Sequence, residues 1–329
     1  MAAEVSRVDA AAVRAAAERI APFVHRTPVQ HSRRLDSNLG ARLFFKCENF
    51  QVGGAFKARG AFNAVWSLAP DEAARGVATH SSGNHGAALA LAAARRGIPA
   101  WVVVPRDASG FKRRAIERYG ARVVDCDPGI SNRETRLAQL LEESGATMVH
   151  PYDDDRVIAG QGTVALELME RVPDLDLLLA PVGGGGLVSG SAVIARDLRP
   201  GIRVVAAEPA GADDCWQSMQ RGERVRLEHV DTVADGLRAS IGSRNWSVIS
   251  RLVDEVVRVE EEEILAATRL AWELLKIVIE PSSAVPLAAL LSGRLPARGR
   301  RVGVVLSGGN VEVAELATRF STCGLEFRL

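Results

Sequence analysis

The sequence lacks the features that place a chain in a membrane or on a nucleic acid. Its 329 residues contain no window near the roughly 20 uninterrupted apolar residues that span a bilayer. The N-terminal segment has a polar, amphipathic helix pattern without the apolar core of a signal peptide. With 41 basic and 40 acidic side chains, the formal net charge of +1 offers no attraction to nucleic acid or to an anionic membrane.

Cysteine is scarce, and its spacing does not fit a zinc site. Cys47, Cys126, Cys215 and Cys323 lie far apart, in none of the paired spacings that bind zinc. Free thiols in a reducing compartment are the simplest interpretation. The sequence therefore predicts a soluble cytoplasmic protein that binds neither nucleic acid nor membrane.

What the chain does contain is a regular alternation of strand-like and helical patterns. Short apolar runs precede longer helical segments, with brief polar connections, which is typical of βαβ units in parallel sheets covered on both faces. We predict strand–helix pairs at Gly76–His80 and Asn84–Arg96, Ala100–Val104 and Phe111–Tyr119, Val123–Asp125 and Asn132–Glu143, Thr147–His150 and Val157–Arg171, and Leu177–Ala180 and Leu187–Leu198. Further strands are predicted at Val204–Ala207 and Arg301–Leu306, and a core helix at Glu261–Ile277. The predicted class is α/β.

The length exceeds that of a usual single core, so we expect two lobes. Residues 76–150 would form a small domain, and residues 1–66 and 155–329 would form a large domain. Ligands of such sheets bind beyond the carboxyl ends of the strands, where this chain carries its glycine-rich turns. A cleft between the two lobes would shield a ligand from water.

A lysine follows the first of these glycine-rich stretches. Residues 51–61 read QVGGAFKARGA, and Lys57 begins an apolar, alanine-bearing helix pattern. A lysine among apolar residues loses hydration, which lowers its pKa and makes a neutral amine available for an imine with an aldehyde cofactor. The alternative is a surface lysine whose stem covers an apolar face.

The longest glycine-rich turn, PVGGGGLVSG at Pro181–Gly190, lies between a predicted strand and a predicted helix. Its unobstructed backbone N–H groups and the positive end of the helix favour a phosphate site. A dinucleotide fingerprint, with Glu208 as the ribose-binding acid, is the runner-up, but the strict G-x-G-x-x-G spacing fails at Val188 and Ser189. A merely flexible turn is the third alternative.

Three further clusters follow predicted strands. Ser81–Gly86 (SSGNHG) either caps a helix or binds a carboxylate or a cofactor oxygen, and Leu306–Asn310 (LSGGN) places a hydroxyl at a strand end. Glu208 and Asp214 lie six residues apart in a turn, where their carboxylates and a backbone carbonyl could bind Mg²⁺ or a similar hard cation. The alternative for this third cluster is an exposed acidic turn.

Taken in order, these motifs resemble those of the fold-type II pyridoxal-phosphate (PLP) enzymes. The similar branch contains serine/threonine dehydratases, threo-3-hydroxyaspartate dehydratases and serine racemases. The resemblance runs from HRTPV at His25–Val29 to LSGGNVE at Leu306–Glu312. It implies a tryptophan synthase β-like fold, two lobes of parallel or mixed sheet with the cofactor in the cleft between them, and a homodimer.

The resemblance also implies roles for the residues of the cofactor site. Lys57 is similar to the lysine that forms the Schiff base, and Phe56 to the residue packed on the cofactor ring. Asn84 resembles the partner of the cofactor's 3-hydroxyl, and Ser307 the partner of the pyridine nitrogen. The phosphate cradle would consist of Gly183, Gly184, Gly185, Gly186 and Leu187.

Substrate and metal residues follow from the same resemblance. Ser82 is similar to the acid/base that racemases use opposite the lysine, so Lys57 and Ser82 are the catalytic candidates. The substrate-binding candidates are Ser81, Ser82, His85 and Arg133. Glu208, the Ala212 carbonyl and Asp214 match the divalent-cation site (Mg²⁺, Mn²⁺ or Ca²⁺) of the racemase and hydroxyaspartate branch.

The implied activity is dehydration and deamination of L-serine, L-threonine or threo-3-hydroxyaspartate to a 2-oxo acid and ammonia. A serine racemase, or one for a related amino acid, with dehydratase side activity is the alternative. A non-catalytic, nucleotide-binding or regulatory protein is a third. Ala239, where racemases tend to have serine, and Tyr152, which resembles the dehydratases, favour elimination. Ala55 replaces the serine that often precedes Phe-Lys in the family. We expect no C-terminal regulatory domain.

Overall fold

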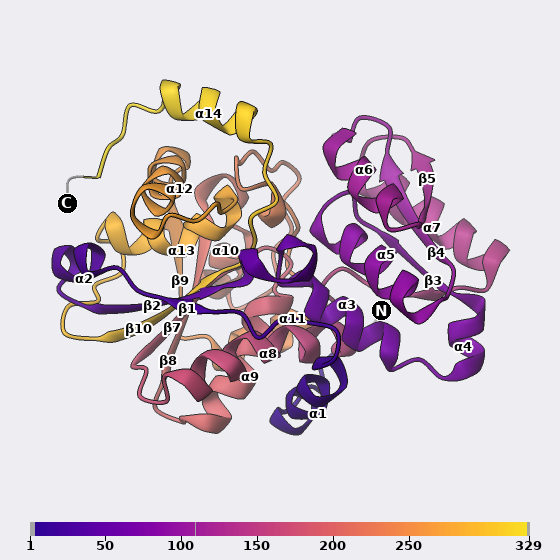
Figure 1. Ribbon diagram of the computed structural model, residues 1–329, viewed down its shortest axis with the longest axis horizontal. Coiled ribbons are helices and arrows are strands. Elements are labelled where there is room, and N and C mark those ends of the chain that lie inside the picture. Colours follow the sequence, from indigo (N-terminus) through magenta and orange to yellow (C-terminus); the bar gives the residue numbers. More distant parts are fainter. Residues whose placement is uncertain (1–3, 109, 328–329) are drawn as a thin grey trace.

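The computed structural model describes residues 4–108 and 110–327 and contains two sheets, which Figure 1 shows in two neighbouring lobes. The six-stranded sheet has the order β1 (Val29–Gln30), β2 (Arg42–Cys47), β10 (Arg301–Leu306), β7 (Leu177–Pro181), β8 (Arg203–Pro209) and β9 (Glu255–Val259). The four-stranded sheet has the order β5 (Arg122–Cys126), β4 (Ala100–Pro105), β3 (Val77–His80) and β6 (Thr147–Met148). β1 pairs antiparallel with β2, and the other strand pairs of the described chain are parallel. The α/β prediction is confirmed.

Helices cover both faces of the six-stranded sheet, which is why its strands are continuous apolar runs. Leu177 and Leu179 of β7 belong to a core shared with α12 (Glu261–Leu275) and α13 (Pro281–Leu291). Leu178 and Ala180 belong to a core on the opposite face, under α8 (Asp155–Arg171), α9 (Gly186–Leu198) and α11 (Ser243–Leu252). The alternation follows from the two-residue period of a strand.

The four-stranded sheet is covered in the same way. Ala78 and Val103 face a small core with α7 (Ile130–Ser144), whereas Val77, Val102 and Val104 face α5 (Asn84–Arg96) and α6 (Gly110–Arg118). This second core continues into α3 (Lys57–Trp66), which Figure 1 shows beside the four-stranded lobe. α3 therefore connects the packing of the two lobes.

Helix α8 contacts its two neighbours through backbone atoms. A Cβ atom on Gly160 would lie 2.7 Å from Gly60 Cα of α3, and one on Gly190 of α9 would lie 2.6 Å from Gly162 N. Helices normally pack 8–10 Å apart with side chains between them, and glycines permit the shorter distance. These two glycine contacts fix α3 and α9 against α8.

A buried cluster of charges joins β2, α3 and α8. The guanidinium of Arg59 donates to both carboxylate oxygens of Glu48 at 2.7 and 2.8 Å, and to those of Glu167 at 2.7 and 2.9 Å. Lys46 Nζ lies 2.6 Å from Glu167 Oε2. Arg59 and Glu48 are completely buried. We call these four residues the ion cluster; it holds the start of α3 in place.

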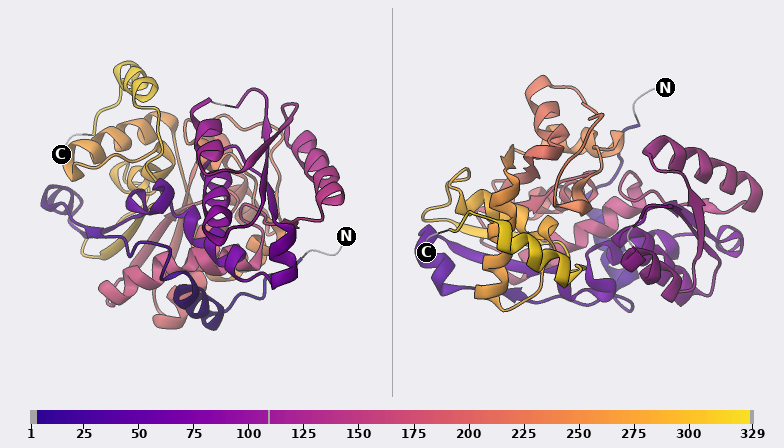
Figure 2. Two further views of the ribbon diagram at one scale, coloured as in Figure 1. Left: turned by 45° about the vertical axis from the view of Figure 1, so that its right-hand side comes forward. Right: turned by 90° about the horizontal axis from the view of Figure 1, so that it is seen from above.

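The remaining helices pack around these layers, which Figure 2 shows from two further sides. They are α1 (Ala10–Ile20), α2 (Arg33–Leu39), α4 (Pro70–Arg75), α10 (Asp214–Arg221), α14 (Val313–Thr322) and the short turns η1 (Glu48–Phe50), η2 (Val52–Gly54), η3 (Ala210–Ala212) and η4 (Asp235–Leu237). The helix predicted over Glu261–Ile277 ends earlier, at Leu275, because Lys276 takes a left-handed φ of 57°. No helix of the described ranges is long and apolar enough to cross a bilayer.

Candidate active site

A cleft of about 1120 Å³ is lined by turns that follow strands of both sheets. Residues after β3, β7 and β10 contribute to it, so it lies beyond the carboxyl ends of these strands, where ligands of α/β sheets bind. The structure brings every predicted cofactor and substrate residue into this one cleft: Phe56, Lys57, Ser81, Ser82, Asn84, His85, Arg133, Gly183, Gly184, Gly185, Gly186, Leu187 and Ser307. Tyr152 and Ala239 line it as well.

Lys57 is the first residue of α3, and its side chain lines the cleft. Its Nζ donates a hydrogen bond to the Pro151 carbonyl at 2.8 Å and lies 5.1 Å from the centroid of the Phe56 ring. Burial lowers the pKa of Lys57 to about 8, and the nearby charge of Glu280 opposes that shift. A neutral amine is therefore accessible near neutral pH, as the sequence predicts.

The glycine turn between β7 and α9 is buried, and side chains would not fit there. A Cβ on Gly184 would overlap the Tyr152 ring, and one on Gly183 would lie 2.8 Å from Leu237 Cα. Gly185 has a φ of 96°, a conformation that favours glycine. The first N–H groups of α9 have no partner within the helix, which makes the turn suitable for an anion. The alternative of a merely flexible turn is wrong because its surroundings enclose it.

Asn84, the first residue of α5, is held by side chains from the other lobe. Its Nδ2 donates to Glu280 at 2.9 Å (Oε1) and 3.2 Å (Oε2), and its Oδ1 accepts from Asn310 Nδ2 at 3.0 Å. Glu280 directly precedes α13 and is buried. The sequence analysis missed Glu280, because a single glutamate before a proline belongs to no motif.

Ser307 lies directly after β10 and is buried beside Ser283. The two hydroxyl oxygens are 3.1 Å apart, and Ser283 Oγ also accepts from Gly308 N at 2.7 Å and donates to Gly308 O at 2.6 Å. Ser283 was not predicted. Both side chains are neutral, so this position offers a cofactor nitrogen a hydroxyl and no carboxylate.

The start of α5 carries the predicted substrate residues. Ser81 Oγ accepts from Gly83 N at 3.4 Å, whereas the Ser82 hydroxyl makes no hydrogen bond within residues 4–108 and 110–327. His85 is buried with Nε2 3.3 Å from the Val149 carbonyl and with Nδ1 unpartnered among the described residues. Burial, and secondarily Lys57, keep the pKa of His85 well below its ordinary value, so its ring is neutral.

Two further histidines line the cleft and were not predicted. The rings of His80 and His150 lie edge to face with centroids 5.4 Å apart, and burial lowers the pKa of each to about 4. His150 Nδ1 accepts from Asp153 N at 2.9 Å, so the neutral ring carries its proton on Nε2. The available signal was their position: both lie at or just after the carboxyl ends of strands β3 and β6.

Arg133 places an unsatisfied donor at the cleft. It belongs to α7, and its buried Nε has no partner in the described chain. Its charge contributes to lowering the pKa of His80. Because a buried guanidinium nitrogen without a partner is costly, this position favours an anionic group of a ligand.

The predicted cation residues lie outside the cleft. Glu208 lies near the carboxyl end of β8, Ala212 is in η3 and Asp214 begins α10. Glu208 accepts from Cys215 N at 3.1 Å and Trp216 N at 2.9 Å, and Asp214 accepts from Ile241 N at 2.8 Å.

Arginines only partly balance the charges of this site: Arg224 opposes the rise in the pKa of Asp214, and Arg258 pairs with the neighbouring Asp213 at 2.7 Å. Burial, and next the charge of Asp214, raise the pKa of Glu208 well above its ordinary value, and burial raises the pKa of Asp214 to about 6. Within residues 4–108 and 110–327, no three His, Cys, Asp or Glu side chains are arranged so that they could hold a metal ion together, so a cation here would also need backbone or water oxygens. The two buried carboxylates with raised pKa values fit a hard divalent cation, which would relieve the repulsion between them.

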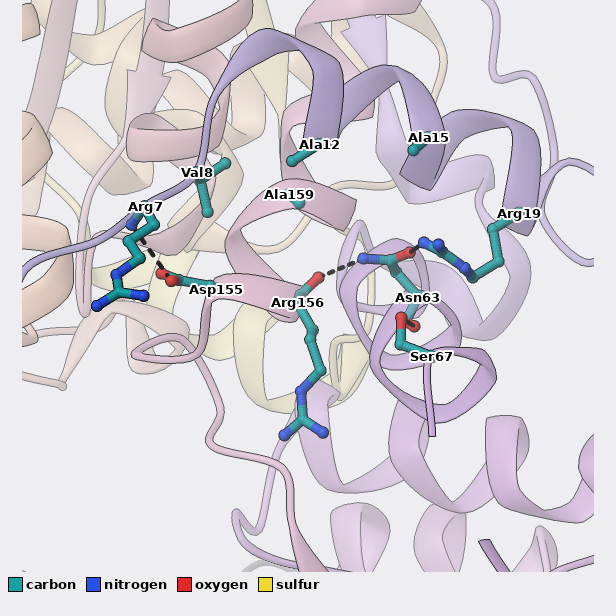
Figure 3. Close-up of a pocket in the computed structure, with 10 residues that line it drawn as sticks. All are labelled: Arg7, Val8, Ala12, Ala15, Arg19, Asn63, Ser67, Asp155, Arg156 and Ala159. Carbon is teal, nitrogen blue, oxygen red and sulfur yellow. Dashed lines mark hydrogen bonds between the residues drawn. The ribbon is translucent and has the colours of Figure 1, made fainter. Parts of the chain in front are cut away.

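A smaller hollow of about 240 Å³ lies between α1, α3 and α8 and is drawn in Figure 3. The Asn63 side chain accepts from Arg19 Nη1 and donates to the Arg156 carbonyl, both at 2.6 Å. The central polar groups therefore satisfy each other. None of the predicted site residues lies in this hollow.

Comparison with known proteins agrees with this geometry. A family model described as "Pyridoxal-phosphate dependent enzyme" matches residues 20–308. Serine racemase from Arabidopsis thaliana is 48% identical over 319 residues, covering 95% of this chain and 96% of that protein. The beta-hydroxyaspartate dehydratase of Paracoccus denitrificans (strain Pd 1222) is 49% identical over 302 residues, covering 92% and 96%. The structure of maize serine racemase has a TM-score of 0.92 at 45% identity and covers 96% of this chain and 97% of that one.

Proposed function

Because the chain belongs to the pyridoxal-phosphate dependent enzymes, we propose that it dehydrates and deaminates a 3-hydroxy amino acid to a 2-oxo acid and ammonia. The observation that carries the proposal is the position of Lys57, an amine of lowered pKa in the same cleft as an enclosed glycine turn. A relative at 49% identity is a beta-hydroxyaspartate dehydratase, which supports this chemistry.

The residues present fit the cofactor. Lys57 would bind its aldehyde carbon, and Gly183–Leu187, where Cβ atoms have no room, would hold its phosphate. Phe56 would contact the ring, Asn84 its 3-hydroxyl and Ser307 its pyridine nitrogen. When bound, PLP supplies an electron-withdrawing ring that stabilises negative charge on the substrate's α-carbon.

Lys57 would act as the general base at the α-carbon. A pKa of about 8 leaves a share of the amine neutral at neutral pH, and a base near the working pH is most effective. The glycine turn would keep the phosphate away from bulk water, and His80, His85 and His150 would present neutral rings to the cleft. These rings add no positive charge that would compete with Arg133 for an anionic substrate.

For the substrate, Ser81, Ser82 and His85 at the start of α5 would bind the α-carboxylate. The unpartnered Nε–H of Arg133 would donate to a second carboxylate, which favours threo-3-hydroxyaspartate beside L-serine and L-threonine. The methyl side chain of Ala239 lines the cleft and contributes no hydroxyl there.

Racemisation is the second candidate function. The Ser82 hydroxyl is the observation that favours it, because it lines the cleft without a hydrogen bond in the described chain and could carry a proton. Serine racemases are among the similar proteins. Ser82 would then deliver a proton to the face of the α-carbon opposite Lys57.

A divalent cation is proposed at the acidic turn after β8. Glu208, the Ala212 carbonyl and Asp214 would bind Mg²⁺, with Mn²⁺ or Ca²⁺ as alternatives.

Two domains are proposed from the two sheets. Residues 76–150 would be the small domain, and residues 1–66 and 155–329 the large PLP-binding one. A homodimer in the cytoplasm is the proposed assembly, and the exposed apolar side chains of Phe50 and Val278 support a partner surface.

The test is a proton NMR time course in heavy water with Mg²⁺, L-serine, L-threonine and L-threo-3-hydroxyaspartate. Loss of one substrate into its oxo acid is the expected result and names the preference. Exchange of the α-proton followed by appearance of the other enantiomer would instead establish the racemase. Lys57→Ala should abolish turnover and the visible absorbance of the bound cofactor; retained turnover would overturn the proposal.

A further inference from the structure

One buried amide contacts both the glycine turn and the segment that holds Lys57. Asn245, in α11, is completely buried, and its Nδ2 donates to the Gly184 carbonyl at 3.0 Å and to the Tyr152 carbonyl at 2.9 Å. Gly242 N donates to the same Gly184 carbonyl at 3.2 Å. Two donors from one direction therefore fix the orientation of that carbonyl.

The orientation of this carbonyl determines where the next N–H group points. The described chain has no cis peptide bond, and in a trans peptide the C=O and the following N–H point in opposite directions. With Gly184 O directed at Asn245 and Gly242, the N–H of Gly185 is directed away from α11. Gly185 lines the cleft, so this N–H is available to an anion there.

Asn245 is itself held in place. Asp153 Oδ1 accepts from the backbone N–H of Arg244 at 2.9 Å and of Asn245 at 3.3 Å, and Asp153 Oδ2 accepts from Ser243 N at 3.0 Å. These bonds cap the N-terminus of α11. A Cβ on Gly185 would lie only 2.8 Å from Asn245 Cβ, so α11 lies directly against the turn.

The same amide reaches toward the lysine. Tyr152, whose carbonyl accepts from Asn245, follows Pro151, whose carbonyl accepts from Lys57 Nζ at 2.8 Å. A shift of the Asn245 side chain would therefore release one peptide group of the glycine turn and one peptide group next to the lysine contact. The link consists of two hydrogen bonds and the single peptide unit between Pro151 and Tyr152.

We propose that Asn245 is a positioning residue that orients the Gly184–Gly185 peptide toward the phosphate of the cofactor. The inference rests on the assignment of Gly183–Leu187 as the phosphate cradle under the proposed function. It predicts that Asn245 strengthens the binding of the phosphate group specifically, rather than binding of the cofactor ring.

The test compares PLP with pyridoxal, which lacks the phosphate, by absorbance titration of the full-length apoenzyme. In Asn245→Leu, which keeps the size of the side chain and removes its donors, PLP affinity should fall at least tenfold while pyridoxal affinity changes less than twofold. Asn245→Thr, which keeps one short donor, should give an intermediate preference. Ser191→Ala in the adjacent α9 is the control, since the Ser191 hydroxyl is buried without a partner in the described chain; its preference should equal that of the wild type.

The outcomes distinguish a failure of the positioning role of Asn245 from a failure of the phosphate-cradle assignment. Equal weakening of PLP and pyridoxal by Asn245→Leu would show a general loss of structure and overturn the positioning role. A wild-type chain that binds both ligands equally would overturn the cradle assignment itself. If Asn245→Leu does not fold, Asn245→Ala takes its place: it offers no side-chain donor to the two carbonyls, so it must also lose the preference for PLP.

Discussion

The molecule buries two groups of charges and treats them in opposite ways. The ion cluster of Lys46, Glu48, Arg59 and Glu167 pairs two bases with two acids at distances of 2.6 to 2.9 Å. The pair of Glu208 and Asp214 consists of two acids, whose carboxylates accept hydrogen bonds from backbone N–H groups of the described chain. Apart from Glu167, whose side chain is 13% exposed, the residues of both groups are buried.

The difference shows which of the two groups has its buried charges balanced without a ligand. In the ion cluster, Arg59 lowers the pKa of Glu48 in spite of burial, so the carboxylate stays charged. In the acidic pair, burial raises both pKa values, and the charged form is unfavourable until a cation arrives. The ion cluster therefore contributes to the fold without a ligand. The contribution of the Glu208–Asp214 pair to stability depends on the pH and on the concentration of a divalent cation.

Breaking the ion cluster should have the largest effect. Arg59→Met removes the guanidinium that pairs with the buried Glu48 carboxylate and leaves only the more distant Lys46 Nζ, at 3.9 Å, to oppose its charge. Removing one partner of a buried pair costs about 3–5 kcal/mol. We expect that loss in the free energy of unfolding, measured by urea denaturation, with and without Mg²⁺ alike. In the double variant Arg59→Met/Glu48→Leu, part of the loss should return; no recovery would mean that Arg59 acts through packing alone.

Removing the proposed cation should have the next largest effect. A ligand at a hundred times its dissociation constant stabilises a fold by about 2.7 kcal/mol. We therefore expect saturating Mg²⁺ to raise the urea midpoint of the wild-type chain relative to EDTA. Glu208→Gln removes one of the two charges and should abolish this shift; a shift that persists in Glu208→Gln would place the cation elsewhere.

Acid should destabilise the chain through the histidines of the cleft. Burial lowers the pKa of His80 and of His150 from 6.5 to about 4. Between these values the unfolded chain binds more protons than the folded chain, so the free energy of unfolding falls as the pH drops from 6.5 to 4. His150→Gln should reduce that fall by about 1–2 kcal/mol, measured by urea denaturation at several pH values. An unchanged slope would assign the acid sensitivity to other groups.

The smallest effect is expected at the surface end of α8. Arg26 and Glu170 form an ion pair at 2.7 Å, but both side chains are well exposed. Exposed pairs contribute little because water screens them, so Arg26→Met should change the unfolding free energy by less than about 1 kcal/mol. It is the matched control for Arg59→Met, since Glu170 follows Glu167 by one turn of the same helix.

Much of the fold was readable from the sequence because apolar runs and helical spacing are local. The predicted strands at 100–104 and 301–306 and the helix at 84–96 agree with β4, β10 and α5 within one residue. The left-handed Lys276 was not readable, because a lysine carries no signal for positive φ. Strand β2 and helix α13 also had no motif that set them apart.

The candidate site was readable where its residues form motifs. Lys57, the SSGNHG segment and the glycine turn follow one another along the chain as short motifs, and the structure places them in one cleft. Glu280, Ser283 and Asn245 were missed because each is a single polar residue whose partner is distant in sequence. Only the folded chain brings such partners within hydrogen-bonding distance.

The glycine contacts of α8 have a consequence for how this enzyme can vary. Gly160 contacts Gly60, and Gly162 contacts Gly190, through main-chain atoms. The distance between Lys57 and the glycine turn is therefore set by the direct backbone packing of α3, α8 and α9. Ordinary substitutions in the surrounding core leave that spacing unchanged. Cleft side chains that are not assigned to the cofactor, such as those of Arg133 and Ala239, are therefore the positions at which substrate preference can drift, during evolution or in a directed library, without loss of the cofactor.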